Sequence, residues 1–194
     1  MKRAIARADI IDADEYAKHR REHKKRLTEL KRNRRVEVGP FATFYFENYD
    51  TMWHQVQEML HIERGGEAQI ADELDAYNPL IPQGAELIAT VMFEIDDPLR
   101  RANVLGQLGG VENHLYLSVG GDKIVGEPDP TRENTSPEGK ASAVQFMRFR
   151  FSPALIARFR DPATQVLVGS DHPRYGHIAV MPNATRAALA EDFG

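Results

Sequence analysis

One predicted helix, from Asp50 to Glu63, carries the residues whose spacing is best suited to chemistry. His54, Glu58 and His61 follow one another at four and three positions, so they gather on one face of that helix. Glu58 and His61 have the Glu-x-x-His spacing with which di-iron bundle proteins place two ligands on one helix. A bundle of that kind needs a second such motif, and the chain has none. The pattern therefore favours an exposed polar face over a zinc or iron site.

The opposite face of this helix is apolar, with Met52, Val56 and Met59 in one stripe. Glu63 falls inside the stripe, which predicts a carboxylate that points toward the protein interior. We therefore count Glu63 among the candidate ligand-binding residues.

A second cluster, Asp171 to His177, holds two histidines, an aspartate and a tyrosine. Asp171 could orient His172, and the two histidines could meet at a metal ion or an anion. The proline and the glycine between them are equally explained by turn geometry at a hairpin tip, which is the favoured interpretation. The alternative is a metal-dependent enzyme that uses Glu58, Glu63, His172 and His177, with Fe or Zn held by Glu58, His172 and His177.

A third group is spread over three predicted strands. Arg148 and Arg150 share one face of a strand, while Glu94 and Glu47 end the faces of two others. If these faces coincide, charges of both signs meet beside aromatic rings. Structural Arg–Glu pairing is the favoured explanation, and a pocket for a carboxylate or phosphate is the alternative. The candidate ligand-binding residues are Glu47, Glu63, Glu94, Arg148 and Arg150.

Composition limits the class of protein. The chain has 194 residues, of which 42% are hydrophobic and 28% charged, as expected for one globular domain over residues 1–194. The longest nearly continuous apolar run, Leu87 to Phe93, is too short to span a bilayer. Cysteine is absent, which excludes disulfides, a thiol nucleophile and clusters held by thiolates of this chain. Because no signal-like apolar block opens the sequence, we expect a cytoplasmic protein without membrane contact.

The charge is distributed unevenly. Residues 18–35 hold ten basic and two acidic side chains and so carry +8; since the whole chain is −4, the remainder carries −12. A solvated basic helix that folds back on an acidic body is the favoured interpretation. The alternative is an arm that docks on an acidic protein or, less readily, on nucleic acid, because the basic run at 18–35 lacks aromatic residues for stacking. The candidate partner-binding residues are Arg20, Lys24, Lys25, Arg26 and Arg32.

Hydrophobic periodicity predicts an α+β fold, with helices packed on a largely antiparallel sheet and a long basic N-terminal helix in the arm at 12–35. That helix has a thin apolar stripe, so it could project or pair with a second copy of the chain. Residues 126–140 form a polar loop, interpreted as disordered rather than as a lid. The expected helices are 12–34, 51–63, 67–77, 97–108 and 152–159, and the expected strands are 36–38, 41–47, 87–95, 115–119, 123–125, 143–151, 165–168 and 178–181.

Short segments along most of the chain are similar to a bacterial family catalogued as domain of unknown function three-five-zero-one. They are Phe46–Asn48, Gln55–Leu60 with Glu63, Ala76–Pro82, Ala89–Thr90, Ser142–Phe146 with Arg148–Phe149, and Asp171–Pro173 with Tyr175. No activity is assigned to the family, so the resemblance implies no catalytic residue. Genes of the family often neighbour those of rubrerythrin-like and iron–sulfur proteins, which implies a redox or oxidative-stress setting.

The sequence thus predicts an accessory or binding protein that works with an iron-dependent redox protein. The alternatives are the metal-dependent enzyme described above and a protein that binds nucleic acid through the basic helix.

Overall fold

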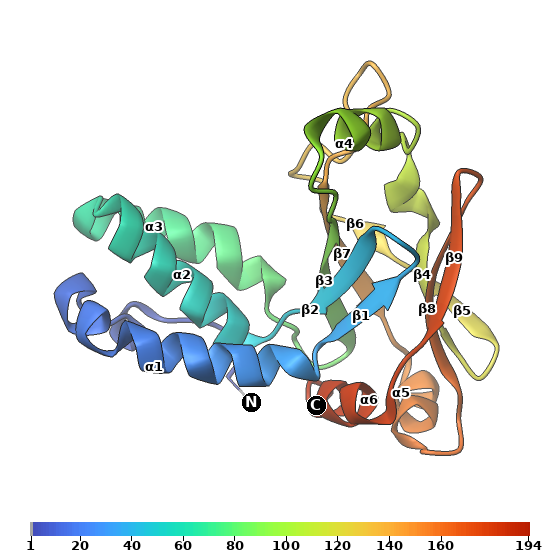
Figure 1. Cartoon of the computed structure of the whole chain (residues 1–194). Helices are drawn as coiled ribbons and strands as arrows, with labels where there is room; N and C mark the ends of the chain where they lie inside the picture. The colour runs from blue at the N-terminus through green and yellow to red at the C-terminus, as the bar shows by residue number, and fades with distance from the viewer. Residues whose placement is uncertain (1) are drawn as a thin grey trace.

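The computed structural model describes residues 2–194, which form two antiparallel sheets and six α-helices (Figure 1). The predicted α+β class is confirmed, although two sheets replace the single sheet that was expected. The α-helices are α1 (Ala13–Arg32), α2 (Tyr49–Glu63), α3 (Gly66–Tyr77), α4 (Pro98–Leu105), α5 (Pro153–Arg160) and α6 (Asn183–Ala190). Short 3₁₀ turns are η1 (Arg7–Asp9), η2 (Asn78–Leu80) and η3 (Val111–His114).

The first sheet has the strand order β1-β2-β3-β7-β6, and the second has the order β5-β4-β8-β9. The strands of the first sheet are β1 (Arg35–Val38), β2 (Ala42–Phe46), β3 (Glu86–Phe93), β7 (Val144–Arg150) and β6 (Glu127–Pro128). Those of the second are β4 (Leu115–Val119), β5 (Asp122–Val125), β8 (Val166–His172) and β9 (Tyr175–Val180). β8 and β9 run further than predicted, so most of the expected tip at 171–177 is paired strand.

The main hydrophobic core lies between the two sheets. Alternate residues of β2 and β3, such as Phe44 and Val91, point into it and meet Leu117 and Val168 of the second sheet. The other residues of β2, β3 and β7 therefore face away from this core, toward the helices.

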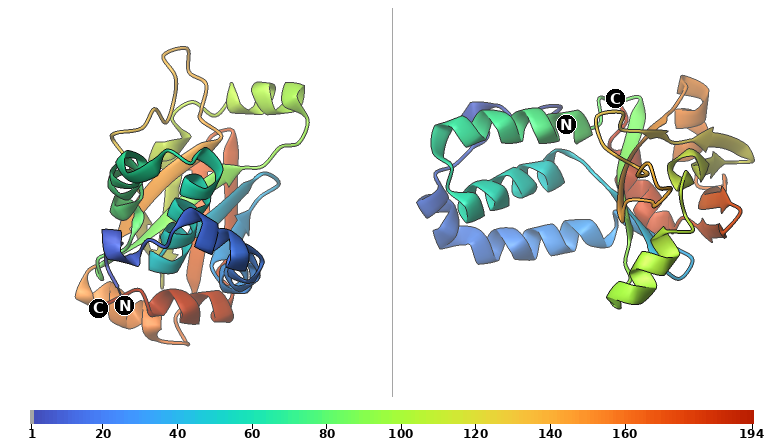
Figure 2. Two further views of the ribbon diagram at one scale, coloured as in Figure 1. Left: turned by 90° about the vertical axis from the view of Figure 1, so that its left-hand side faces the viewer. Right: turned by 90° about the horizontal axis from the view of Figure 1, so that it is seen from above.

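The helices α1, α2 and α3 lie side by side and extend away from the first sheet (Figures 1 and 2). A second core forms where they meet each other and the outer face of that sheet, around Val56, Leu60 and Ile88. The N-terminus of α2 is capped by Asn48, whose Oδ1 accepts from Thr51 N. This cap fixes the point at which the chain leaves β2 and enters the helix.

No helix formed by residues 2–194 combines the length and the apolar character needed to cross a bilayer. The loop at 126–140 contains β6 and is bonded to residues outside it: Asn134 O accepts from Ser142 N, and Thr135 Oγ1 donates to Glu112. Its mobility stays a prediction.

Candidate functional site

A cavity of about 430 Å³ opens between the helices and the outer face of the first sheet. We call it the sheet cavity. Its floor comes from β2, β3 and β7, and its walls come from α1, α2 and the α3–η2 corner. The lining residues are Lys31, Tyr45, Glu47, Met52, Gln55, Tyr77, Leu80, Thr90, Met92, Val144 and Phe146.

Strand register explains why these floor residues meet. Tyr45 lies opposite Thr90, and Thr90 lies opposite Phe146 on the next strand. One step along, Met92 lies opposite Val144. Because side chains alternate along a strand, all of these residues share one face of the sheet. The strand faces that carry Glu47, Glu94 and Arg148 in the third predicted group therefore do coincide.

Glu47 is the ionisable group at the bottom of this arrangement. It follows β2 directly and is only 5% exposed. Its Oε1 accepts a hydrogen bond of 2.7 Å from Thr90 Oγ1, whereas its buried Oε2 has no partner among residues 2–194. A buried carboxylate oxygen left without a donor is costly, so this atom is a candidate acceptor for a ligand.

The backbone at Glu47 is held firmly. Arg34, which is 2% exposed, donates from Nε to Phe46 O at 3.0 Å and from Nη2 to Glu47 O at 3.1 Å. The same guanidinium pairs with the buried carboxylate of Asp192 near the C-terminus. Burial raises the pKa of Asp192, although Arg34 opposes that shift. This anchor keeps the Glu47 side chain in place at the cavity.

Aromatic and thioether side chains surround the carboxylate. Tyr45, Tyr77 and Phe146 present rings to the cavity, and Met52 and Met92 add polarizable sulfur. Ring faces attract cations, and a carboxylate supplies the opposite charge. The carboxylate and the rings suit an organic cation, and Lys31 on the cavity wall adds one positive charge that such a ligand must lie away from.

Two predicted ligand-binding residues lie elsewhere. Glu94 is exposed at the rim, where it accepts from Thr43 Oγ1 at 2.7 Å and from Tyr45 OH at 2.9 Å. Glu63 is exposed at the far end of α2 and accepts from Gln69. The prediction that Glu63 points inward is wrong, because the last turn of α2 extends beyond the sheet it was expected to cover.

The two predicted arginines are paired within the protein. Arg148 Nη1 donates to the buried carboxylate of Glu86 at 3.0 Å, and its Nη2 donates to Pro79 O. Arg150 pairs with Glu127 at 2.8 Å. Both arginines line a neighbouring cavity that shares Phe146 with the first. Structural pairing, the favoured interpretation, agrees with these contacts.

The face of α2 that the sequence predicted to be exposed is covered by α1. His54 is buried, and Glu58 is only 14% exposed, because Tyr16 of α1 packs between them. Glu58 accepts from Tyr16 OH at 2.7 Å and from Arg20 at 2.8 and 2.9 Å, with Lys24 at 3.2 Å. Arg20, with help from Tyr16 and Lys24, lowers the pKa of Glu58 to about 2. The expectation of a solvated face is therefore wrong.

The predicted metal ligands are not brought together. Glu58 lies in the helical part and His172 in the second sheet, and among residues 2–194 no three His, Asp or Glu side chains form a metal-sized group. His172 Nδ1 accepts from Arg174 N at 3.2 Å, so Nε2 carries the proton that faces Gly109 O at 3.3 Å. Both nitrogens are occupied, and neither offers a lone pair to a metal.

His177 and Asp171 also have local partners. The His177 ring packs on Tyr175, with ring centroids 4.6 Å apart. Asp171 lies between Lys123 and His114, whose Nδ1 is 2.8 Å away, and these neighbours, Lys123 first, lower the pKa of Asp171. The predicted orientation of His172 by Asp171 is replaced by a pairing with His114.

Five of the basic residues of α1 fall into two groups. Arg20 and Lys24 point at Glu58, as described above, and are used inside the protein. Arg21, Lys25 and Arg32 are exposed and have no ion pair among residues 2–194. These three residues are spaced by four and seven residues along the chain, so they share the outer face of the helix.

Sequence reasoning missed Tyr77 and Gln55 of the sheet cavity, and it missed Arg34, which holds the backbone of Glu47 in place. Tyr77 and Gln55 come from helices whose orientation no local pattern gives. A signal for Arg34 did exist, because it directly precedes a strand in which alternate residues are buried. By its place in the sequence, Arg34 counts as one more charge of the basic arm.

Comparison with known proteins places the chain in a known group. The model of a family described as "Protein of unknown function (DUF3501)" matches residues 4–193. A crystal structure described as a novel protein of unknown function from Burkholderia pseudomallei K96243 is similar at 33% identity and a TM-score of 0.91, covering 98% of this chain and 100% of that one. A search of curated proteins found no match.

Proposed function

The chain belongs to the DUF3501 family, and we propose that it is a binding protein that holds a small organic cation in the sheet cavity. The unpartnered Oε2 of Glu47 carries the proposal. An ammonium or guanidinium group would donate to this oxygen while its carbon skeleton lies against Tyr45, Tyr77 and Phe146. Of the eleven lining residues, seven belong to the segments that resemble the family, which supports a role for the cavity itself.

The test is thermal unfolding in the presence of alkyl and aryl ammonium and guanidinium ions, with matched alcohols and carboxylates. A cation at 100 times its Kd stabilises the folded state by about 2.7 kcal/mol, which is a measurable shift in Tm. Stabilisation by carboxylates or phosphates instead of cations would contradict the proposal and favour the anion pocket expected from the arginines.

Two variants sharpen this test. Glu47→Gln removes the charge but keeps an oxygen for Thr90, and it should weaken cation binding about ten- to hundredfold. Glu63→Gln is the matched control, since Glu63 is an exposed carboxylate on α2 outside the cavity. Equal loss of binding in both variants would show that the cation is attracted by the acidic surface in general.

A second candidate is an accessory role in the cytoplasm, in which the outer face of α1 docks on an acidic, iron-dependent redox protein. The specific observation in its favour is the free charge of Arg21, Lys25 and Arg32. Replacing Lys25 and Arg32 by Gln should abolish binding to rubrerythrin-like or iron–sulfur proteins of the same organism. Arg174→Gln, in a turn of the second sheet, is the control. Retention of DNA instead, with an affinity that falls steeply with salt, would favour the nucleic-acid alternative.

A further inference from the structure

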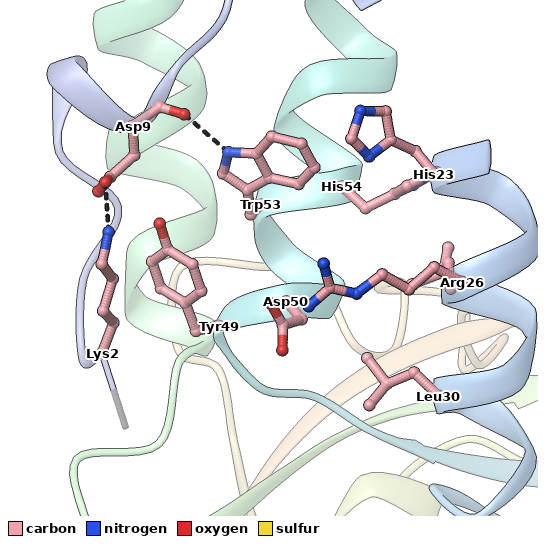
Figure 3. A pocket seen from close by; sticks show the side chains of 10 residues that line it. Lys2, Asp9, His23, Arg26, Leu30, Tyr49, Asp50, Trp53 and His54 are labelled. Atoms are coloured by element: carbon pink, nitrogen blue, oxygen red, sulfur yellow. Dashed lines mark hydrogen bonds and ion pairs between the residues drawn. The ribbon is translucent and has the colours of Figure 1, made fainter. Parts of the chain in front are cut away.

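A second cavity, of about 270 Å³, lies between α1, α2 and the N-terminal segment (Figure 3). We call it the interhelix cavity. It shares no lining residue with the sheet cavity. Trp53, Leu27 and Leu30 form its apolar wall, and the Trp53 ring is fixed because Nε1 donates to Asp9 O at 2.8 Å. This wall suits the apolar part of a small molecule.

The charges around the interhelix cavity are balanced but only partly paired. Lys2 and Asp9 form an ion pair of 2.5 Å that closes one end. Arg26 of α1 and Asp50 of α2 have no ion pair among residues 2–194, and Figure 3 shows the Arg26 guanidinium reaching from α1 toward α2. One free cation and one free anion therefore face the same space, so a ligand with a single charge would meet a like charge.

His54 adds a buried acceptor to this space. Tyr16 donates its single proton to the ionised Glu58, so the Tyr16 oxygen accepts from Nε2–H of His54 at 3.2 Å. Burial lowers the pKa of His54, which keeps the ring neutral, so Nδ1 holds a lone pair. No residue among 2–194 donates to Nδ1, although the side chain is more than nine-tenths buried and lines the cavity. Asp50 and His54 stand one helical turn apart, which places two acceptors on the same face of α2.

We propose that the interhelix cavity binds a small zwitterion, such as a free α-amino acid with a large apolar side chain. Arg26 takes the carboxylate through paired N–H donors, Asp50 and His54 accept from the ammonium group, and the side chain lies on Trp53 and Leu30. The proposal does not depend on the cation site at Glu47.

Isothermal titration with phenylalanine, tryptophan and leucine tests this directly. Each amino acid is compared with its amide, which lacks the carboxylate, and with its N-acetyl derivative, which lacks the ammonium group. The free amino acid should bind about tenfold or more tightly than either derivative, because each derivative loses one charge-assisted contact. Absence of saturable binding by all three amino acids at millimolar concentration would overturn the proposal, as would equal binding of the amides.

Two variants assign the contacts. Arg26→Gln should weaken the amino acid about ten- to hundredfold and leave the amide unchanged, and Asp50→Asn should weaken it without affecting the N-acetyl derivative. Arg21→Gln, on the outer face of α1, is the control for Arg26. Glu47→Gln should leave zwitterion binding unchanged. The zwitterion proposal and the cation proposal can therefore be refuted independently of each other. An amino acid that binds Arg26→Gln as tightly as the wild type would refute the assignment.

Discussion

Glu58 and Glu47 are both largely buried carboxylates beneath helices, yet their surroundings differ. Glu58, between α1 and α2, receives donors from Tyr16, Arg20 and Lys24 on both oxygens. Glu47, between α2 and the first sheet, receives one donor on Oε1 and none on Oε2. The first carboxylate holds two helices together, and the second is left with capacity for a partner from outside.

The difference shows that burial alone does not distinguish structural from candidate binding carboxylates in this fold; the donors of each oxygen and the presence of a cavity are needed as well. Asp192 limits this rule: its Oδ2 pairs with the buried Arg34, but its buried Oδ1, like Oε2 of Glu47, has no partner among residues 2–194. Unlike Glu47, Asp192 lines neither the sheet cavity nor the interhelix cavity. A carboxylate with all its donors in place stabilises the fold, whereas one that lacks a donor and also lines a cavity is a candidate for binding.

The largest expected effect comes from removing the cation of Asp192. Arg34→Met leaves a buried carboxylate without its partner and frees the carbonyls of Phe46 and Glu47, so it should lower the free energy of unfolding by about 3–5 kcal/mol. Arg35→Met, at the exposed neighbouring position, should cost less than about 1 kcal/mol. Urea unfolding measures both values, and equal costs would mean that Arg34 is not an anchor.

The next-largest expected effect concerns Glu58, whose two carboxylate oxygens both accept hydrogen bonds. Glu58→Gln keeps the shape of the side chain but removes the charge that Arg20 and Lys24 share, so it should destabilise the protein by about 1–3 kcal/mol. Glu63→Gln on the same helix is the control and should change stability by less than about 0.5 kcal/mol. A Glu58→Gln variant as stable as the wild type would remove the contrast between Glu58 and Glu47.

The same carboxylate predicts a pH dependence. Arg20 lowers the pKa of Glu58 from 4.5 to about 2 in the folded state, so the unfolded chain binds the proton first as the pH falls. The stability that Glu58 contributes is therefore complete above pH 4.5 and is lost between pH 4.5 and about 2. The gap in unfolding free energy between wild type and Glu58→Gln should close over this range. A gap that is unchanged at pH 2.5 would contradict the shift.

The sheet cavity could be predicted in part because it rests on local alternation. Residues 87–95 read clearly as a strand, and their outward face, with Thr90 and Met92, is the floor of the cavity. Glu47 was a candidate for the same reason. The α+β class and the family were also accessible from the sequence, and both are confirmed.

The rest depended on contacts between distant segments. Tyr16 belongs to the thin apolar stripe of α1, but no local pattern indicates that this stripe covers Glu58 of α2. Local spacing predicts an open turn at His172, whereas strand pairing between His172 and Tyr175 places the His172 nitrogens against backbone groups. In both places tertiary contacts satisfy groups that local spacing leaves free.

The smallest expected effect on stability concerns the open carboxylate, and it separates the two regions most sharply. Glu47→Gln keeps the acceptor for Thr90 Oγ1 and removes a buried negative charge without a partner, so its unfolding free energy should stay within about 1 kcal/mol of the wild type. Urea unfolding without ligand measures this, beside the loss of cation binding in the same variant. Glu58→Gln should show the reverse, which is a large loss of stability with cation binding retained. The two variants together therefore test whether Glu58 is a structural carboxylate and Glu47 a binding carboxylate. If Glu47→Gln is as unstable as Glu58→Gln, both carboxylates stabilise the fold, and Glu47 is not a free acceptor for a ligand in the sheet cavity.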